Sequence, residues 1–215
     1  MNENFAREEI CRVGASLFQR GYAHATAGNI SVKLGDGFLV TPTDACLGLL
    51  DPAQVSKVDT QGNHLSGARP SKTLALHRAI YGACDARCVI HTHSTNCVAL
   101  TLEANDGELL PPITPYFVMK VGHVPVIPYH RPGDPKVAEL VAAQIEAHAK
   151  RGTPIRAVML SRLGPNVWHD SPAQAMAVLE ELEETAKLWR TADPKPAPLT
   201  ASQIEELRAA FGAAW

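Results

Sequence analysis

Hydrophobic and polar positions follow two different periods in the first part of the chain. Residues 5–19 carry apolar side chains at helical spacing, and Gly21 follows them as a stop signal. Residues 30–32 and 38–40 are short apolar runs on either side of the turn sequence at 35–37. The pattern therefore predicts a helix followed by a β-hairpin.

Both patterns recur along the rest of the chain. Short apolar runs predict further strands at 55–58, 88–90, 118–126 (broken by Gly122) and 157–160. Helical spacing predicts helices at 74–80 (after the candidate N-cap Ser71), 94–100, 137–149 and 173–189. A Pro-rich linker at 194–198 precedes a last short helix capped by Thr200.

This order of elements predicts the fold class. Strands and helices are mixed without a strict alternation, which indicates a single layered α/β domain. We place this domain at residues 1–192. Residues 193–215 are then the linker and a C-terminal helix that packs on the domain.

The composition restricts the class of protein. With 215 residues, 46% of them hydrophobic, the chain can bury a full core, which excludes a disordered protein. The formal net charge of -2 gives no reason to expect binding to nucleic acid or to a membrane. The polar start is not typical of a signal peptide, and the five cysteines include no CxxC pair. We therefore expect a cytoplasmic protein with reduced thiols.

The sequence His91-Thr92-His93 is the sharpest local chemical feature. On a strand, residues i and i+2 point to the same face, so the two imidazoles can hold one cation. Zinc commonly takes two such histidines, a third protein ligand and a substrate position. The alternative is a pair of ordinary polar residues at a strand edge.

Three short segments are typical of an anion site. Gly28-Asn29 precedes a predicted strand, Thr41-Pro42-Thr43 follows one, and Ser71-Lys72 opens a predicted helix. A helix N-terminus with hydroxyl groups and a lysine attracts anions. Each segment alone also fits ordinary turn and capping chemistry.

Taken together, these motifs resemble a known family. Their order is Gly28-Asn29-Ile30-Ser31, Thr41-Pro42-Thr43, Pro70-Ser71-Lys72, His91-Thr92-His93 and Leu163-Gly164-Pro165. Over about residues 6–190 this order resembles the class II aldolase/adducin superfamily. Other stretches are similar to its branch of 3-oxo-tetronate 4-phosphate decarboxylases, among them Thr114-Pro115-Tyr116 and Arg131-Pro132-Gly133-Asp134.

The resemblance implies a mainly antiparallel sheet flanked by helices, in a homotetramer whose active sites lie between neighbouring subunits. It implies a divalent cation, zinc in the first instance, held by His91 and His93. It also implies five positions that bind the phosphate of a phosphorylated sugar acid: Gly28, Asn29, Thr43, Ser71 and Lys72.

Three positions depart from the family pattern. The acidic acid–base position is Thr73, whose hydroxyl cannot replace a carboxylate as a base near neutral pH. The third metal histidine falls on Leu163, which cannot bind a metal, and a family glycine is replaced by Asp44.

These departures leave three hypotheses open. The first is a metal-assisted carboxy-lyase that converts a 3-oxo-tetronate 4-phosphate to dihydroxyacetone phosphate and CO2. It needs no base, because the carboxylate is already ionised and the product needs only a proton, from Lys72 or Tyr116. The second is a non-catalytic, adducin-like binding module. The third is an aldolase-type lyase acting on a non-phosphorylated sugar acid, which the negative charge of Asp44 favours.

Two further roles follow from residue type. A third metal ligand could come from His130, or else from His123, His24 or His77. Arg131 suits a substrate carboxylate or phosphate, because its guanidinium binds both in a fork; the alternative is a solvated loop arginine.

Overall fold

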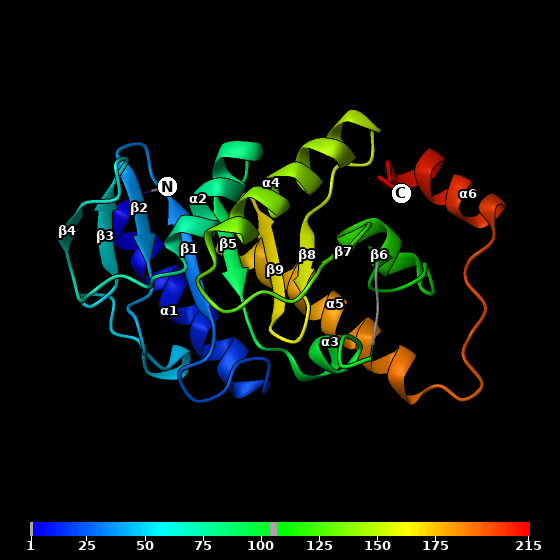
Figure 1. Cartoon of the computed structure of the whole chain (residues 1–215), viewed down its shortest axis with the longest axis horizontal. Coiled ribbons are helices and arrows are strands. Elements are labelled where there is room, and N and C mark those ends of the chain that lie inside the picture. The colour runs from blue at the N-terminus through cyan, green and yellow to red at the C-terminus, as the bar shows by residue number, and fades with distance from the viewer. Residues whose placement is uncertain (1, 104–106) are drawn as a thin grey trace.

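A sheet of nine strands runs through the part of the chain that the structure describes, residues 2–103 and 107–215 of this computed structural model (Figure 1). The strands are β1 (Asn29–Lys33), β2 (Gly37–Val40), β3 (Ser56–Asp59), β4 (His64–Ser66), β5 (Cys88–His91), β6 (Gly107–Glu108), β7 (Pro125–Ile127), β8 (Ala157–Leu160) and β9 (Gly164–His169). Their order is β4-β3-β2-β1-β5-β9-β8-β7-β6, and every neighbouring pair is antiparallel except β7 with β8. The predicted mainly antiparallel sheet is confirmed.

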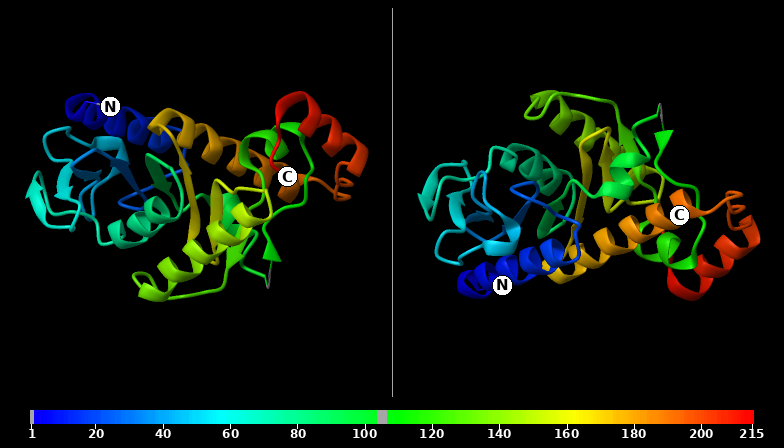
Figure 2. Two further views of the ribbon diagram at one scale, coloured as in Figure 1. Left: turned by 90° about the horizontal axis from the view of Figure 1, so that it is seen from above. Right: turned by 90° about the horizontal axis from the view of Figure 1, so that it is seen from below.

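Helices cover both faces of this sheet. They are α1 (Glu3–Gln19), α2 (Leu74–Ala83), α3 (Thr95–Ala99), α4 (Pro135–Lys150), α5 (Pro172–Thr191) and α6 (Ala201–Phe211), with a 3₁₀ turn η1 (Leu47–Leu49) and a π-helix η2 (Phe117–Val121). Helices α1 and α5 pack on one face, while α2 and α4 pack on the other (Figure 2). Each layer closes its own hydrophobic core, one around Ile10 and Leu179 and one around Ile80 and Val141.

In the second half of the chain one sequence prediction fails in part, and one strand was not predicted. Residues 117–121 form the π-helix η2 rather than a strand, because Phe117, Val118 and Val121 bury one helical face. Gly122, with φ of 79°, ends that helix before β7. Strand β9 has no sequence signal, since Gly164-Pro165 is typical of a turn and proline is rare in central strands.

The C-terminal residues return to the body of the molecule. The predicted Thr200 cap is confirmed, because its side chain and that of Gln203 form a capping box at the start of α6. The final Trp215 packs edge-on against Phe117, with ring centroids 5.7 Å apart. The domain boundary at residue 192 stays a prediction. Within the described residues, none of the helices is both long enough and apolar enough to cross a membrane.

Replacement of Gly164 by alanine should destabilise the protein by about 3 kcal/mol, because the new methyl group would overlap the carbonyl oxygen of Thr92 on the neighbouring segment. Chemical denaturation of the full chain measures this loss. The matched control is Gly82→Ala on α2, where a methyl group meets nothing within 4 Å and should stabilise the helix slightly. Equal unfolding midpoints for the two variants would contradict this account of the β5–β9 contact.

Candidate active site

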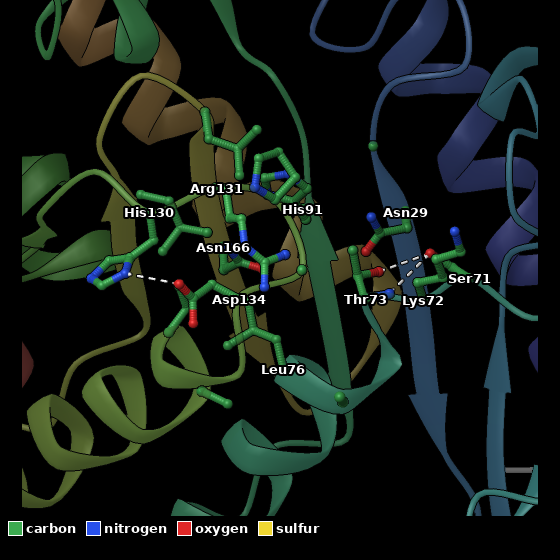
Figure 3. Close-up of a pocket in the computed structure, with 18 of the residues that line it drawn as sticks. Asn29, Ser71, Lys72, Thr73, Leu76, His91, His130, Arg131, Asp134 and Asn166 are labelled. Atoms are coloured by element: carbon green, nitrogen blue, oxygen red, sulfur yellow. Dashed lines mark hydrogen bonds and ion pairs between the residues drawn. The ribbon is translucent and has the colours of Figure 1, made fainter.

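A cavity of about 370 Å³ opens on the sheet face that α2 and α4 cover. Figure 3 shows Asn29, Ser71, Lys72 and Thr73 on one side of this pocket and His130 and Asp134 on the other. His91, Asn166 and Arg131 lie between these two groups (Figure 3). The structure therefore brings together most of the residues that the sequence indicated.

Three polar residues form a row across the sheet on the pocket floor. Asn29 on β1 is the register partner of His91 on β5, and His91 is the partner of Asn166 on β9. Directly opposite residues of antiparallel strands point to the same face with their Cβ atoms about 5 Å apart. All three side chains are buried and line the pocket.

The ring of His91 is held in one orientation. Its Nδ1 lies 2.9 Å from the carbonyl oxygen of Pro165, so Nδ1 carries the proton and donates it. Burial, with the neighbouring His93 as a second cause, lowers the pKa of His91 to about 4. The ring is therefore neutral at pH 7, and its Nε2 lone pair is free to accept a metal.

His93 completes a pair that suits one cation. Its ring centroid lies 5.1 Å from that of His91. Two imidazoles on one tetrahedral zinc ion, with Zn–N bonds of ~2.1 Å, have centroids about 5 Å apart. Burial, with a smaller effect from His24, lowers the pKa of His93, which keeps this ring unprotonated as well. The two histidines therefore fit a divalent cation.

Two loops, one after β2 and one before α2, meet at the end of the pocket where Ser71 and Thr73 lie (Figure 3). The Thr43 backbone N–H donates to the carbonyl of Arg69, and that of Ser71 donates to the carbonyl of Thr41. The Ser71 hydroxyl lies 2.9 Å from that of Thr73 and accepts from the Thr73 backbone N–H. The sequence predicted Ser71 as the N-cap of α2, and this prediction is wrong, because the helix starts after Thr73. The Ser71 hydroxyl lines the pocket instead.

Gly28 and Lys72 complete this polar end. Gly28 has φ of 92°, and a Cβ atom there would lie 2.9 Å from the carbonyl oxygen of His91, so the chain passes too closely for a side chain. Lys72 is exposed and makes no hydrogen bond or ion pair within the described residues. Hydroxyl groups, a close backbone and a lysine together suit an anion.

Comparison with known proteins agrees with this arrangement. Residues 8–190 match the model of the family "Class II Aldolase and Adducin N-terminal domain". The chain belongs to this class II aldolase family. The 3-oxo-tetronate 4-phosphate decarboxylase of Cupriavidus necator is 56% identical, with 99% of each chain covered. The L-fuculose phosphate aldolase of Methanocaldococcus jannaschii is 33% identical, with 84% of this chain and 91% of the relative covered. The solved structure of YgbL from Escherichia coli has a TM-score of 0.87 and 43% identity, covering 96% of this chain and 99% of that one.

Class II aldolases are typically metal-dependent, yet within the described residues no third histidine joins His91 and His93 in a metal site. Leu163, where the resemblance implies a third metal ligand, lines the pocket. The geometry does not bring His130 to the pair: its Nδ1 faces Asp134 Oδ2 at 3.4 Å, on the far side of the pocket. Within the described residues, no three His, Cys, Asp or Glu side chains are arranged to hold a metal.

The other candidate ligands do not line the pocket. His123 stacks on Trp215, with ring centroids 4.2 Å apart, and does not line the pocket. His24 is exposed, with its ring centroid 6.3 Å from that of His93. His77 is fully buried between α2 and the sheet, where its Nδ1 lies 2.7 Å from the Ser31 hydroxyl. His77 is thus a packed residue of α2.

Three further residues that the sequence analysis singled out line the pocket. Thr73, where the resemblance implies the acid–base group, lines the pocket, and Asp44 adopts the left-handed conformation (φ of 57°) that favours glycine. Arg131 extends into the pocket (Figure 3). Tyr116 is 61% exposed at the start of η2 and does not line the pocket of its own chain. Its role as a proton donor stays a prediction.

The buried histidines predict a pH dependence of stability. Burial, with His91 as a second cause, lowers the pKa of His77 to about 3, below its ordinary value of 6.5. Protonation therefore favours the unfolded chain, and this stability is fully present above about pH 6.5 and lost as the pH falls toward 3. The loss is about 1.4 kcal/mol per pH unit for each such histidine. Urea unfolding at pH 6, 5 and 4 should show a shallower pH slope for His77→Asn. Identical slopes for wild type and variant would contradict the buried, neutral ring.

Proposed function

We propose that this chain is a 3-oxo-tetronate 4-phosphate decarboxylase, a carboxy-lyase that releases CO2 and dihydroxyacetone phosphate. The observation that carries the proposal is the 56% identity, over 99% of both chains, to the Cupriavidus necator enzyme of that name. The pocket adds an independent argument, because it combines an anion-binding end with a floor of neutral imidazoles.

The reaction suits a pocket that has a threonine where the resemblance implies a carboxylate base. The bond between the carboxylate carbon and C2 breaks, and its electron pair moves toward the 3-oxo group. CO2 leaves, and C2 then takes a proton to give dihydroxyacetone phosphate. No step removes a proton from a hydroxyl group, so the hydroxyl of Thr73 at the acid–base position is compatible with turnover.

The floor would orient the reacting end of the substrate. His91 and His93 would hold the divalent cation, zinc in the first instance, and a cation there supplies Lewis-acid polarisation of the 3-oxo oxygen when it is bound. Arg131 extends from its loop toward the same space, where its fork would hold the substrate carboxylate.

The other end would bind the phosphate. Ser71, Thr43 and Lys72 meet there, at the start of α2, beside the close backbone of Gly28 and the amide of Asn29. Lys72 has no protein partner within the described residues, so its ammonium group is available for the phosphate and for proton donation to C2. The homotetramer with intersubunit sites, the cytoplasmic location and a second donor in Tyr116 remain predictions from the resemblance.

A direct assay tests this proposal. The purified chain, supplied with zinc, manganese or cobalt, is incubated with 3-oxo-tetronate 4-phosphate, and triose phosphate is measured by NADH-coupled reduction. We expect release well above the spontaneous rate. Turnover of the unphosphorylated acid alone would favour the aldolase-type alternative instead. No turnover of either acid would favour the binding module.

Lys72 should contribute to affinity through the phosphate. Loss of one charge-assisted hydrogen bond costs roughly 1.5–3 kcal/mol, so Lys72→Met should lower kcat/KM for the phosphorylated substrate by about 10- to 100-fold. The control is Lys136→Met on the first turn of α4, which is exposed and does not line the pocket. Equal kcat/KM values for the two variants would remove Lys72 from the phosphate site.

A further inference from the structure

Asn166 is the most conspicuous group that the proposed reaction leaves without a role. Its side chain is fully buried on β9, at 0% exposure, and lines the pocket. Neither its Oδ1 nor its Nδ2 has a hydrogen-bond partner within the described residues. Burial of an unpaired amide is unfavourable, so such a side chain indicates a group that enters the pocket and pairs with it.

The position of this amide restricts what it can bind. Asn166 is the register partner of His91, so the two side chains lie next to each other on the same sheet face. The His91 Nδ1 bonds the carbonyl of Pro165, the residue just before Asn166. This bond holds the ring along β9 and leaves its Nε2 for the pocket. The amide therefore lies beside the His91 ring and lines the same pocket.

A divalent cation bound by His91 and His93 would lack a third protein ligand. His91 and His93 supply two nitrogens, and Leu163 supplies no donor atom. No third His, Cys, Asp or Glu in the described part of the chain joins them. An amide oxygen is outside those four residue types, and carboxamide oxygens are ordinary ligands of divalent cations.

We propose that Asn166, through Oδ1, is the third protein ligand of the divalent cation that His91 and His93 hold. The inference rests on the cation site of the proposed function, but not on the identity of the substrate. Two imidazoles and one amide oxygen form a harder donor set than three imidazoles. Manganese and cobalt should therefore compete better with zinc here than they do at a three-histidine site.

Cation affinity without substrate tests this proposal. The full-length chain is stripped with chelator, and Zn²⁺, Co²⁺ and Mn²⁺ are titrated by calorimetry at pH 7. Asn166→Leu, which removes the oxygen at similar volume, should weaken binding at least about 10-fold. Asn166→Asp, which keeps an oxygen and adds a negative charge, should strengthen Mn²⁺ binding. The Co²⁺ absorption spectrum should change in both variants.

A matched variant makes the test specific. Asn29 flanks His91 on the opposite strand and has a buried Oδ1 that also lacks a partner within the described residues. Asn29→Leu should leave cation affinity within about 2-fold of wild type. Wild-type affinity in Asn166→Leu, a larger loss in Asn29→Leu, or no cation binding by the wild type would each overturn the proposal.

The cation affinities can be interpreted separately from folding and from catalysis. Circular dichroism of the metal-free proteins shows whether each variant is folded. If Asn166→Leu is unfolded, Asn166→Asp still tests the proposal. Unchanged Mn²⁺ affinity and an unchanged Co²⁺ spectrum in Asn166→Asp would overturn the proposal. A failed decarboxylase assay would not alter these affinities, so the two proposals fail separately.

Discussion

The pairing of β5 with β1 on one side and β9 on the other determines the position of every group on the pocket floor. It sets Asn29, His91 and Asn166 in one row, and the same contact brings the carbonyl of Pro165 to the His91 ring. Gly164 permits this approach, because any side chain there would meet the backbone of Thr92. The chemistry of the site therefore depends on a backbone contact.

Burial and exposure divide the pocket into two kinds of surface. The floor is desolvated, which keeps His91 unprotonated and strengthens any electrostatic interaction with a ligand. The rim carries exposed cationic side chains, Lys72 and Arg131, which suit the charged ends of a small phosphorylated acid. This division matches a substrate that has its reacting carbon between two anionic groups.

Sequence reasoning predicted the parts whose signals are local. Helical spacing gave α1 and α5, and His91-Thr92-His93 identified the two imidazoles because strand geometry alone puts them on one face. The features that sequence reasoning missed depend on contacts between segments that are distant in the sequence. Gly164-Pro165 is typical of a turn, and only pairing with β5 and β8 makes this segment a strand. Asn166 was therefore missed, although a polar residue two positions before the buried Trp168 was the one available clue. The place of His130 was unpredictable for the same reason, because its pairing with Asp134 depends on the loop before α4.

The most direct test of this account follows the carboxylate carbon itself. The chain is given 3-oxo-tetronate 4-phosphate labelled with carbon-13 in the carboxylate, and the products are followed by NMR against an enzyme-free sample. The account predicts that all of the label consumed appears as CO2 and bicarbonate, with an equal amount of unlabelled dihydroxyacetone phosphate. Label retained in an organic acid product, or loss of label no faster than in the enzyme-free sample, would contradict it.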